Sequence, residues 1–213
     1  MITLIIIAIT CGASLLSMEN HDLQNRYMFN AYAISHNREW WRFLTHGLLH
    51  ANFMHLFFNM YALYLFGTFV ENSFKLDFLF GKINGELIYV LLYVGGLVVS
   101  SIYSYFKHKD NSYYNALGAS GAVSAVIYSS ILLNPLSKIY IMAIIGMPAW
   151  IFGFLYLGIS WYLARKNVGN IGHDAHFWGA VYGFLLPIAF KPELLSDFTL
   201  LIRSYFLYGG IPG

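Results

Sequence analysis

The sequence predicts an all-α, polytopic membrane protein in which a single domain, residues 1–213, forms a bundle of six transmembrane helices. Apolar residues make up 58% of the chain, whereas a soluble domain has about 45–50%. Only 10% of the residues are charged, against about 25% in a soluble domain. The apolar residues also gather into runs near the roughly 20 residues that a bilayer-spanning helix needs. A chain of this composition is expected to face lipid rather than water.

Each apolar run is bounded by polar or helix-breaking residues, and we interpret each as one span. The first run is short, but it lacks the basic start and the small-residue cleavage site of a signal peptide. The fourth run stops at Asn134-Pro135, which is a turn signal. The predicted spans cover residues 2–18, 50–70, 87–106, 117–133, 149–163 and 175–190.

The segments between these runs are predicted to lie at the membrane interface. Residues 19–42 are polar but rich in aromatic side chains, as interfacial loops are. Residues 139–148 precede the fifth helix and are expected to form a short re-entrant or interfacial piece. The apolar tail at 198–208 is interrupted by Arg203 and is also expected to be interfacial. Basic residues divide almost evenly between the two sides, so charge does not set the orientation.

The composition also limits the partners. The net charge is +2 without a basic run, so we expect the lipid bilayer, and no nucleic acid, as a partner. Cys11 is the one cysteine of the chain and cannot form a disulfide within it.

Ionisable side chains inside a span are costly and mark candidate sites. The first such place holds His46, His50, His55 and Asn59; within it the pairs His46/His50 and His55/Asn59 are spaced to share a helix face. A metal site needs three or four convergent ligands, and this spacing and the lack of an H-E-x-x-H motif disfavour one. We therefore predict no metal and no cofactor. His46 and His50 are expected to be structural, bonding backbone carbonyls near a helix start.

The second place is Gly118-Ala119-Ser120-Gly121, at the start of the fourth span. A serine at a helix N-terminus is suited to nucleophilic catalysis, because free N–H groups and the helix dipole favour developing negative charge. The alternative is that this run of small residues only allows tight helix packing.

The third place is His176 with Gly179 and Gly183, which share one face of the sixth span. That face can approach another helix closely. The alternative is an interfacial histidine followed by ordinary packing glycines. Spans two, four and six run in the same direction, so all three places lie at one side, roughly 5–15 Å below the membrane surface. A serine, a histidine and hydrogen-bond donors at one depth are the parts of an acyl-transfer site. No carboxylate is expected at that depth to orient the histidine, except Asp174, which is next to the helix start. A Ser–His dyad is therefore the more economical interpretation.

At this point the sequence resembles the rhomboid family of intramembrane serine proteases. The matching elements occur in family order over most of the chain, and six helices match the minimal bacterial core. The resemblance implies a multi-pass protein of the bacterial inner membrane that cleaves transmembrane protein substrates. The elements are Glu39-Trp40-Trp41-Arg42, His46-x3-His50-x4-His55-x3-Asn59, Gly118-x-Ser120-Gly121 and Ala175-His176-x2-Gly179-x3-Gly183.

The resemblance also implies residue roles. Ser120 is expected to be the nucleophile and His176 the general base. His55, Asn59 and the backbone N–H of Ser120 are expected to form the oxyanion hole. Supporting roles are implied for Trp41, Arg42, Gly118, Gly121, Gly179 and Gly183.

Access to the site is implied as well. Span five would be a lateral gate whose face carries bulky residues, residues 165–174 would cap the site, and Gly169 and Gly172 would make this cap pliable. The site would open to the extracytoplasmic side, with both termini in the cytoplasm. Substrates are expected to carry helix-breaking residues near the top of their span and a small residue before the cut. The bulky residues are Trp150, Phe152, Phe154, Tyr156 and Trp161.

One position departs from the family. In several bacterial members an aromatic residue lies one turn after the nucleophile and packs against the histidine, and here that position is Ser124. Either another aromatic, such as Phe177 or Trp178, holds the ring, or Ser124 offers a hydrogen bond.

Two rival functions use the same residues differently. A catalytically inactive rhomboid-like protein would bind membrane clients without hydrolysis. A transporter or metal channel would use the histidines of span two, although short loops and a lack of acidic residues in the spans weigh against it.

Overall fold

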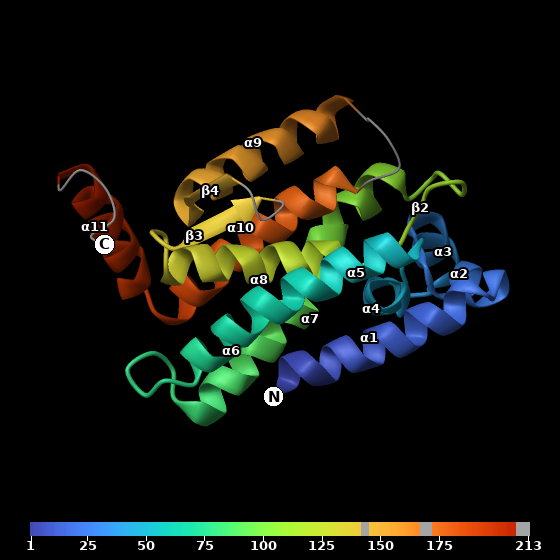
Figure 1. Ribbon diagram of the computed structural model, residues 1–213. Helices are drawn as coiled ribbons and strands as arrows, with labels where there is room; N and C mark the ends of the chain where they lie inside the picture. Colours follow the sequence, from blue (N-terminus) through green and yellow to red (C-terminus); the bar gives the residue numbers. More distant parts are fainter. Residues whose placement is uncertain (142–144, 167–171, 208–213) are drawn as a thin grey trace.

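The fold is a bundle of long helices with shorter elements packed at its two ends (Figure 1). The computed structural model describes residues 1–141, 145–166 and 172–207. The second helix is one continuous rod in which a π-helical turn, η2, joins α5 to α6. The long elements are α1 (Ile2–Met18), α5 (Phe53–Ala62), η2 (Leu63–Gly67), α6 (Thr68–Phe74), α7 (Lys82–His108), α8 (Ser120–Leu133), α9 (Ala149–Lys166) and α10 (His173–Phe190).

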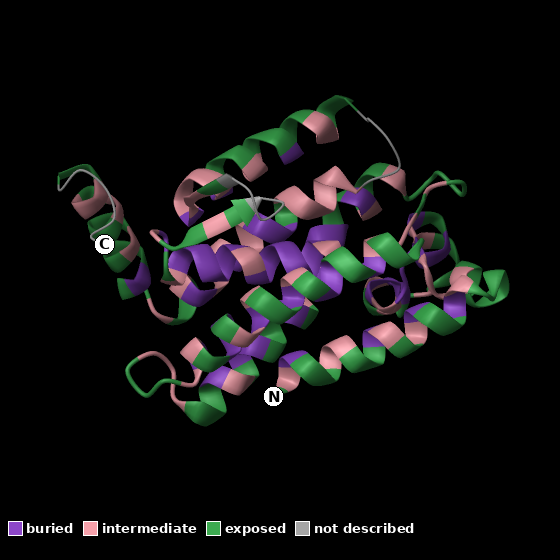
Figure 2. Cartoon of the chain, viewed as in Figure 1, coloured by how far each residue is buried: buried purple, intermediate pink, exposed green. Residues whose placement is uncertain are grey.

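Helix α8 lies in the middle of the bundle and is buried on nearly all sides (Figure 2). Helices α7 and α10 pack against it, and α9 lies along the outside of α10 and α8 (Figure 1). The interior carries serines as well as apolar residues, among them Ser100, Ser124 and Ser129. Small polar side chains of this kind allow membrane helices to approach closely.

The outward faces of the helices are apolar and exposed. On α1, Ile5 and Ile9 are 58% and 56% exposed, and on α9 Phe154 is 68% exposed. The exposed sides of α1, α5 and α9 run along the outside of the bundle in Figure 2. An exposed apolar surface of this extent around a partly polar interior is suited to lipid.

Among the described residues, two helices are long and apolar enough to cross a membrane, Phe53–Phe74 and Lys82–His108. Ile2–Met18 and Ser120–Leu133 are apolar but shorter. Helix α8 has 14 residues, or about 21 Å of rise, against a hydrocarbon core of about 30 Å. Six spans therefore stay a prediction. The helix bounds also differ from those expected: the second begins at Phe53 and the third at Lys82.

Two short β-pairs show that the fold is mostly helical rather than all-α. Strand β1 (Phe29–Asn30) pairs antiparallel with β2 (Asn115–Ala116). Strand β3 (Lys138–Ile141) pairs antiparallel with β4 (Ile145–Pro148). The described parts of the predicted re-entrant piece, residues 139–141 and 145–148, therefore form a β-pair, in keeping with their β-branched isoleucines.

The predicted interfacial segments are also more ordered than expected. The segment 19–42 contains two short helices, which Asn20 and Asn30 cap with their side chains. The C-terminal helix begins before the predicted tail. These elements are α2 (His21–Tyr27), α3 (Ala31–Asn37), α4 (Arg42–Thr45), the 3-10 turn η1 (His46–Leu48) and α11 (Glu193–Leu207).

Glu71 joins the start of α1 to α6. Its carboxylate is 1% exposed and accepts hydrogen bonds from the backbone of Ile2 and Thr3, each at 2.9 Å. Lys75 donates to it from the same helix at 2.7 Å. A carboxylate at a helix N-terminus satisfies free N–H groups and complements the dipole. The expectation that the spans lack acidic residues was wrong, because α6 extends past Glu71 to Phe74.

Candidate active site

Helices α5, α8 and α10 all begin at one end of the bundle, at the right of Figure 1. Ser120 is the first residue of α8, while His55 and His176 lie in the first turns of α5 and α10. The three predicted polar places therefore share one end of the bundle.

The backbones of α8 and α10 touch beside Ser120 and His176. A Cβ atom built on Gly179 would lie 2.1 Å from the carbonyl oxygen of Gly121. A Cβ built on Gly121 would lie 3.5 Å from the carbonyl oxygen of Ala175. The residues adjoining Ser120 and His176 are thus in contact across the two helices. Within the described residues, no hydrogen bond joins the Ser120 hydroxyl to the His176 ring.

The ring of His55 packs against Gly118, two residues before Ser120. Gly118 has φ +123°, a conformation that L side chains rarely adopt. A Cβ built there would lie 2.7 Å from Cε1 of His55 and 3.0 Å from its Nε2. The glycine therefore lets an imidazole reach the loop that leads into α8.

Asn59 lies on the same helix as His55 and is buried. Its Nδ2 donates to the carbonyl oxygen of His55 at 2.9 Å. A carboxamide has two N–H donors, so one of them is occupied within α5 and one is left for another acceptor.

His46 and His50 form hydrogen bonds with the loop that precedes Ser120. His46 lies in η1 and His50 in the following loop, so the expected shared helix face was wrong. Nε2 of His50 accepts from the N–H of Ala119 at 3.3 Å, and the carbonyl of His46 accepts from the N–H of Gly118 at 3.0 Å. The His50 ring bonds an N–H and a hydroxyl, whereas the His46 ring bonds a hydroxyl and, as predicted, backbone groups.

The hydroxyl partners of these rings were missed by the sequence reasoning. Nδ1 of His50 lies 2.9 Å from Oγ of Ser14, and Nε2 of His46 lies 3.2 Å from Oγ of Ser101. Because Nε2 of His50 is an acceptor, its proton sits on Nδ1 and is donated to Ser14. Ser14 in turn donates to the carbonyl of Leu48 at 2.7 Å. Serines on α1 and α7 carry no sequence signal for this role.

Acid should loosen this support, because only a neutral His50 can accept from Ala119. Burial, with smaller contributions from His55 and His46, lowers the pKa of His50 from 6.5 to about 3. Because the pKa of His50 is lower in the folded protein than in the unfolded chain, the neutral histidine contributes its full stability above pH 6.5. That contribution is lost as the pH falls toward 3. We expect a loss of about 1.4 kcal/mol per pH unit in this window, measured as thermal unfolding in detergent from pH 7 to 4.

The control for this experiment is His50→Gln, which does not titrate. Its unfolding midpoint should fall less steeply with acid, although His46 still contributes because burial lowers its pKa to about 4. If the unfolding midpoint fell with pH at the same slope in His50→Gln and in the unchanged protein, His50 would not be the source of the acid sensitivity.

Arg42 organises the segment before the site. It is buried, and its Nη1 donates to the carbonyls of Asn25 and Met28 at 2.9 and 2.7 Å. Its Nε donates to the carboxylate of Glu39. Trp41 is the N-cap residue of α4 and is 47% exposed. Of the predicted Trp41–Arg42 pair, only Arg42 is therefore buried.

The ring beside His176 comes from α9. Tyr156 stacks on His176 with ring centroids 6.1 Å apart and an interplanar angle of 28°. The hydroxyl of Tyr156 lies 2.8 Å from Oγ of Ser124. Phe177 and Trp178, the aromatics expected from sequence, contact each other instead. Ser124 thus takes part through a hydrogen bond to an aromatic of another helix.

The predicted cap falls largely outside the described residues, since 167–171 are not described. Asp174 at its edge forms an ion pair with Lys107 at 3.4 Å. In the part of the chain that is described, no three His, Cys, Asp or Glu side chains are grouped closely enough to share a metal ion.

Comparison with known proteins agrees with the motif pattern. The family model described as Rhomboid domain matches residues 37–193. RHOMBOID-like protein 12, mitochondrial, of Arabidopsis thaliana is 30% identical over 142 residues, 64% of this chain and 42% of that protein. Rhomboid protease GluP of Bacillus subtilis is 30% identical over 179 residues, 81% of this chain and 32% of that protein.

Putative rhomboid protease YdcA, also of Bacillus subtilis, is 30% identical over 152 residues, 70% of this chain and 67% of that protein. The chain spans less than half the length of the first two relatives. The family model nevertheless covers most of the chain, including His55, Asn59, Ser120 and His176. The chain therefore belongs to the rhomboid family.

Proposed function

We propose that this protein is an intramembrane serine endopeptidase that cleaves transmembrane segments with a dyad of Ser120 and His176. The observation that supports it best is the contact of Gly121 with Gly179 and Ala175. That contact joins the first turn of α8, which begins with Ser120, to the first turns of α10, which carry His176. Relatives named as rhomboid proteases point the same way.

In this mechanism Oγ of Ser120 attacks the scissile carbonyl carbon, and His176 accepts the hydroxyl proton. The carbonyl oxygen becomes an oxyanion, stabilised by the N–H of Ser120 and by His55 and Asn59. His176 then gives the proton to the leaving amine. Water, deprotonated by His176, hydrolyses the acyl-enzyme and regenerates Ser120.

The Ser120 hydroxyl has no hydrogen-bond partner among the residues that the structure describes, which is consistent with such a site at rest. Catalytic hydrogen bonds are often long before substrate binds and tighten in the complex. The free N–H of the Asn59 carboxamide is suited to an oxyanion, because the other N–H is already bonded to His55.

The proposed setting is a bilayer, since rhomboid family members are integral membrane proteins. We propose six spans, formed by α1, the α5–α6 rod, α7, α8, α9 and α10, within one domain. The site would face the extracytoplasmic side of a bacterial inner membrane, and the partners would be transmembrane substrates. Polar residues of the site need water, which reaches this depth only in a cavity walled by protein.

The substrate must expose a peptide bond that a helix normally hides. Helix-breaking residues lower that cost by about 1 kcal/mol for glycine and about 3 for proline. We expect purified protein in proteoliposomes to cleave a substrate with such residues near the top of its span faster than its all-leucine counterpart. Gel analysis of the products measures this, and equal cleavage of both would contradict local unwinding.

The alternative is an inactive rhomboid-like protein that binds membrane clients. The lack of a direct Ser120–His176 hydrogen bond is the observation that favours it. A fluorophosphonate probe separates the two proposals, because it labels only an activated serine. Labelling that disappears in Ser120→Ala supports the protease, whereas no labelling of either protein supports the inactive alternative.

A further inference from the structure

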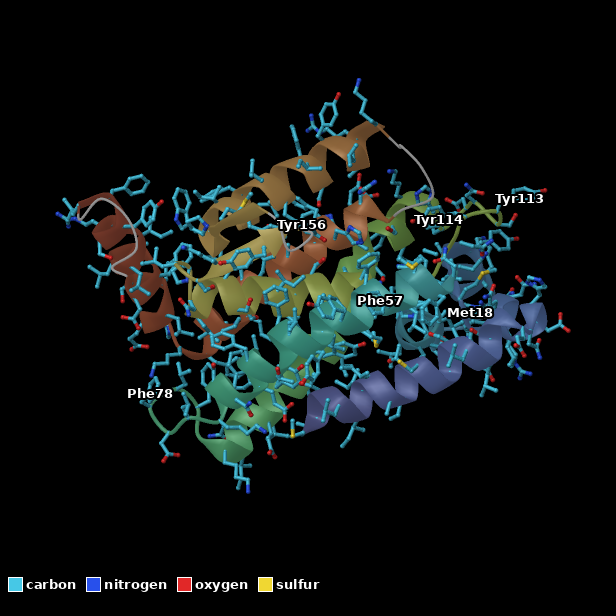
Figure 3. The ribbon with its side chains drawn as sticks, viewed as in Figure 1. Met18, Phe57, Phe78, Tyr113, Tyr114 and Tyr156 are labelled. Carbon is cyan, nitrogen blue, oxygen red and sulfur yellow. The ribbon has the colours of Figure 1, made fainter. Side chains whose placement is uncertain are left out.

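We propose that Tyr156 of α9 is a positioning residue for His176, so that the histidine is oriented only while α9 lies against α8. This inference rests on the proposed protease function. It adds a positioning residue to the site and makes the orientation of His176 depend on the position of α9. Tyr156 lies between the ribbons of α9 and α10 in Figure 3.

Both ends of the Tyr156 side chain are fixed. Its backbone belongs to α9, and its hydroxyl lies 2.8 Å from Oγ of Ser124 on α8. Ser124 is 2% exposed, and a hydrogen bond in such a protected place holds its partner more firmly than one in water. Ser124 also follows Ser120 by one helical turn, so the bond ties Tyr156 to the helix of the nucleophile.

The ring of Tyr156 packs against the ring of His176. The two rings are stacked at 6.1 Å, and His173 meets His176 edge-on at 6.0 Å. The Tyr156 ring also lies near the rings of Phe152 and Tyr128, at centroid distances of 5.8 and 6.0 Å. The imidazole thus contacts two rings, and one of them is carried by α9.

Helix α9 itself buries few of its residues. Its buried residues are Ala149, Gly153 and Ser160, while its outer face is apolar and exposed. Besides the Ser124 bond, Tyr128 of α8 donates to the carbonyl of Gly153. Moving α9 outward therefore breaks the bond to Ser124 and removes the ring from His176. While a substrate enters beside α9, His176 would not be oriented for catalysis. The return of α9 to α8 would restore the orientation of His176.

The experiment uses the full chain in proteoliposomes and measures kcat, KM and the fluorophosphonate labelling rate. Tyr156→Ala should lower kcat and the labelling rate about 10–100-fold with little change in KM, because a base displaced by about 1 Å costs that much. Tyr156→Phe keeps the ring and loses one hydrogen bond, so a decrease of about 2–10-fold is expected. Ser124→Ala should match it, and the double variant should be no worse than either single one.

Two further variants separate positioning from a general loss of structure. Tyr162→Ala removes a tyrosine of the same helix that is 56% exposed and should leave kcat unchanged. Ser124→Tyr places an aromatic on α8, so it should clash while Tyr156 is present and restore activity in Tyr156→Ala.

Unchanged kcat in Tyr156→Ala, a change confined to KM, or additive effects of Tyr156→Phe and Ser124→Ala would overturn the proposal. Failure of the unchanged protein to be labelled at Ser120 would instead overturn the proposed function.

Discussion

Replacing Ser120 by alanine should lower the rate of substrate cleavage by at least about a thousandfold, and His176→Ala should do the same. In serine proteases, loss of the nucleophile or of its base removes up to about 10⁶ of the rate, and the remainder comes from binding and the oxyanion hole. Because the two groups act as a unit, the double variant should be no slower than either single one. Cleavage of a helix-destabilised substrate in proteoliposomes measures all three rates.

The controls are residues of the same type away from the site. Ser196→Ala in α11 and His21→Ala in α2 change exposed side chains and should retain full activity. If Ser120→Ala cleaves at the unchanged rate, the nucleophile has been assigned wrongly. If the effects of Ser120→Ala and His176→Ala multiply in the double variant, the two side chains do not act as a dyad.

The grouping of the site could be predicted because it depends on helix direction. The predicted spans two, four and six must begin at the same side, and in the structure His55, Ser120 and His176 each lie within a turn of the start of α5, α8 or α10. The contacts within the group could not be predicted in this way. That His50 accepts from Ala119, and that Ser14 then accepts from His50, depends on the path of a loop between helices.

Tyr156 illustrates the same limit more sharply. The spacing from Ser120 to Ser124 indicated that an aromatic was missing, and residues near His176 in the sequence were the natural replacements. The ring comes instead from α9, 20 residues before His176. Sequence proximity favoured Phe177 and Trp178, but on a helix consecutive residues point in different directions.

The helices themselves were predictable from apolar runs, whereas their ends and the segments between them were not. Hydropathy could not show that α7 begins at Lys82, because a lysine at a helix end can extend to the interface. Nor could it show that residues 138–141 and 145–148 pair as strands, since a short apolar run fits a strand or a helix equally well.

Replacing Gly179 by alanine should impair both folding and catalysis, because there is no space for a methyl group between α8 and α10. A Cβ at Gly179 would lie 2.1 Å from the carbonyl oxygen of Gly121, which is backbone and cannot turn aside. The helices must therefore separate, and overpacking of this kind costs about 1–3 kcal/mol or more. Since the same contact joins the turns of Ser120 and His176, a shift of about 1 Å should also lower the labelling rate about a hundredfold.

Gly183→Ala probes the same interface one turn farther along, where a Cβ would lie 2.0 Å from the carbonyl oxygen of Ala125. It should lose similar stability, measured as the thermal unfolding midpoint in detergent. Gly158→Ala in α9 is the matched control, because a Cβ there has no atom within 4 Å, and alanine in a helix stabilises by about 1 kcal/mol. A Gly179→Ala protein as stable and as rapidly labelled as Gly158→Ala would mean that α8 and α10 do not meet at these glycines. Reduced stability with unchanged labelling would mean that their contact supports the fold without positioning the two reacting side chains.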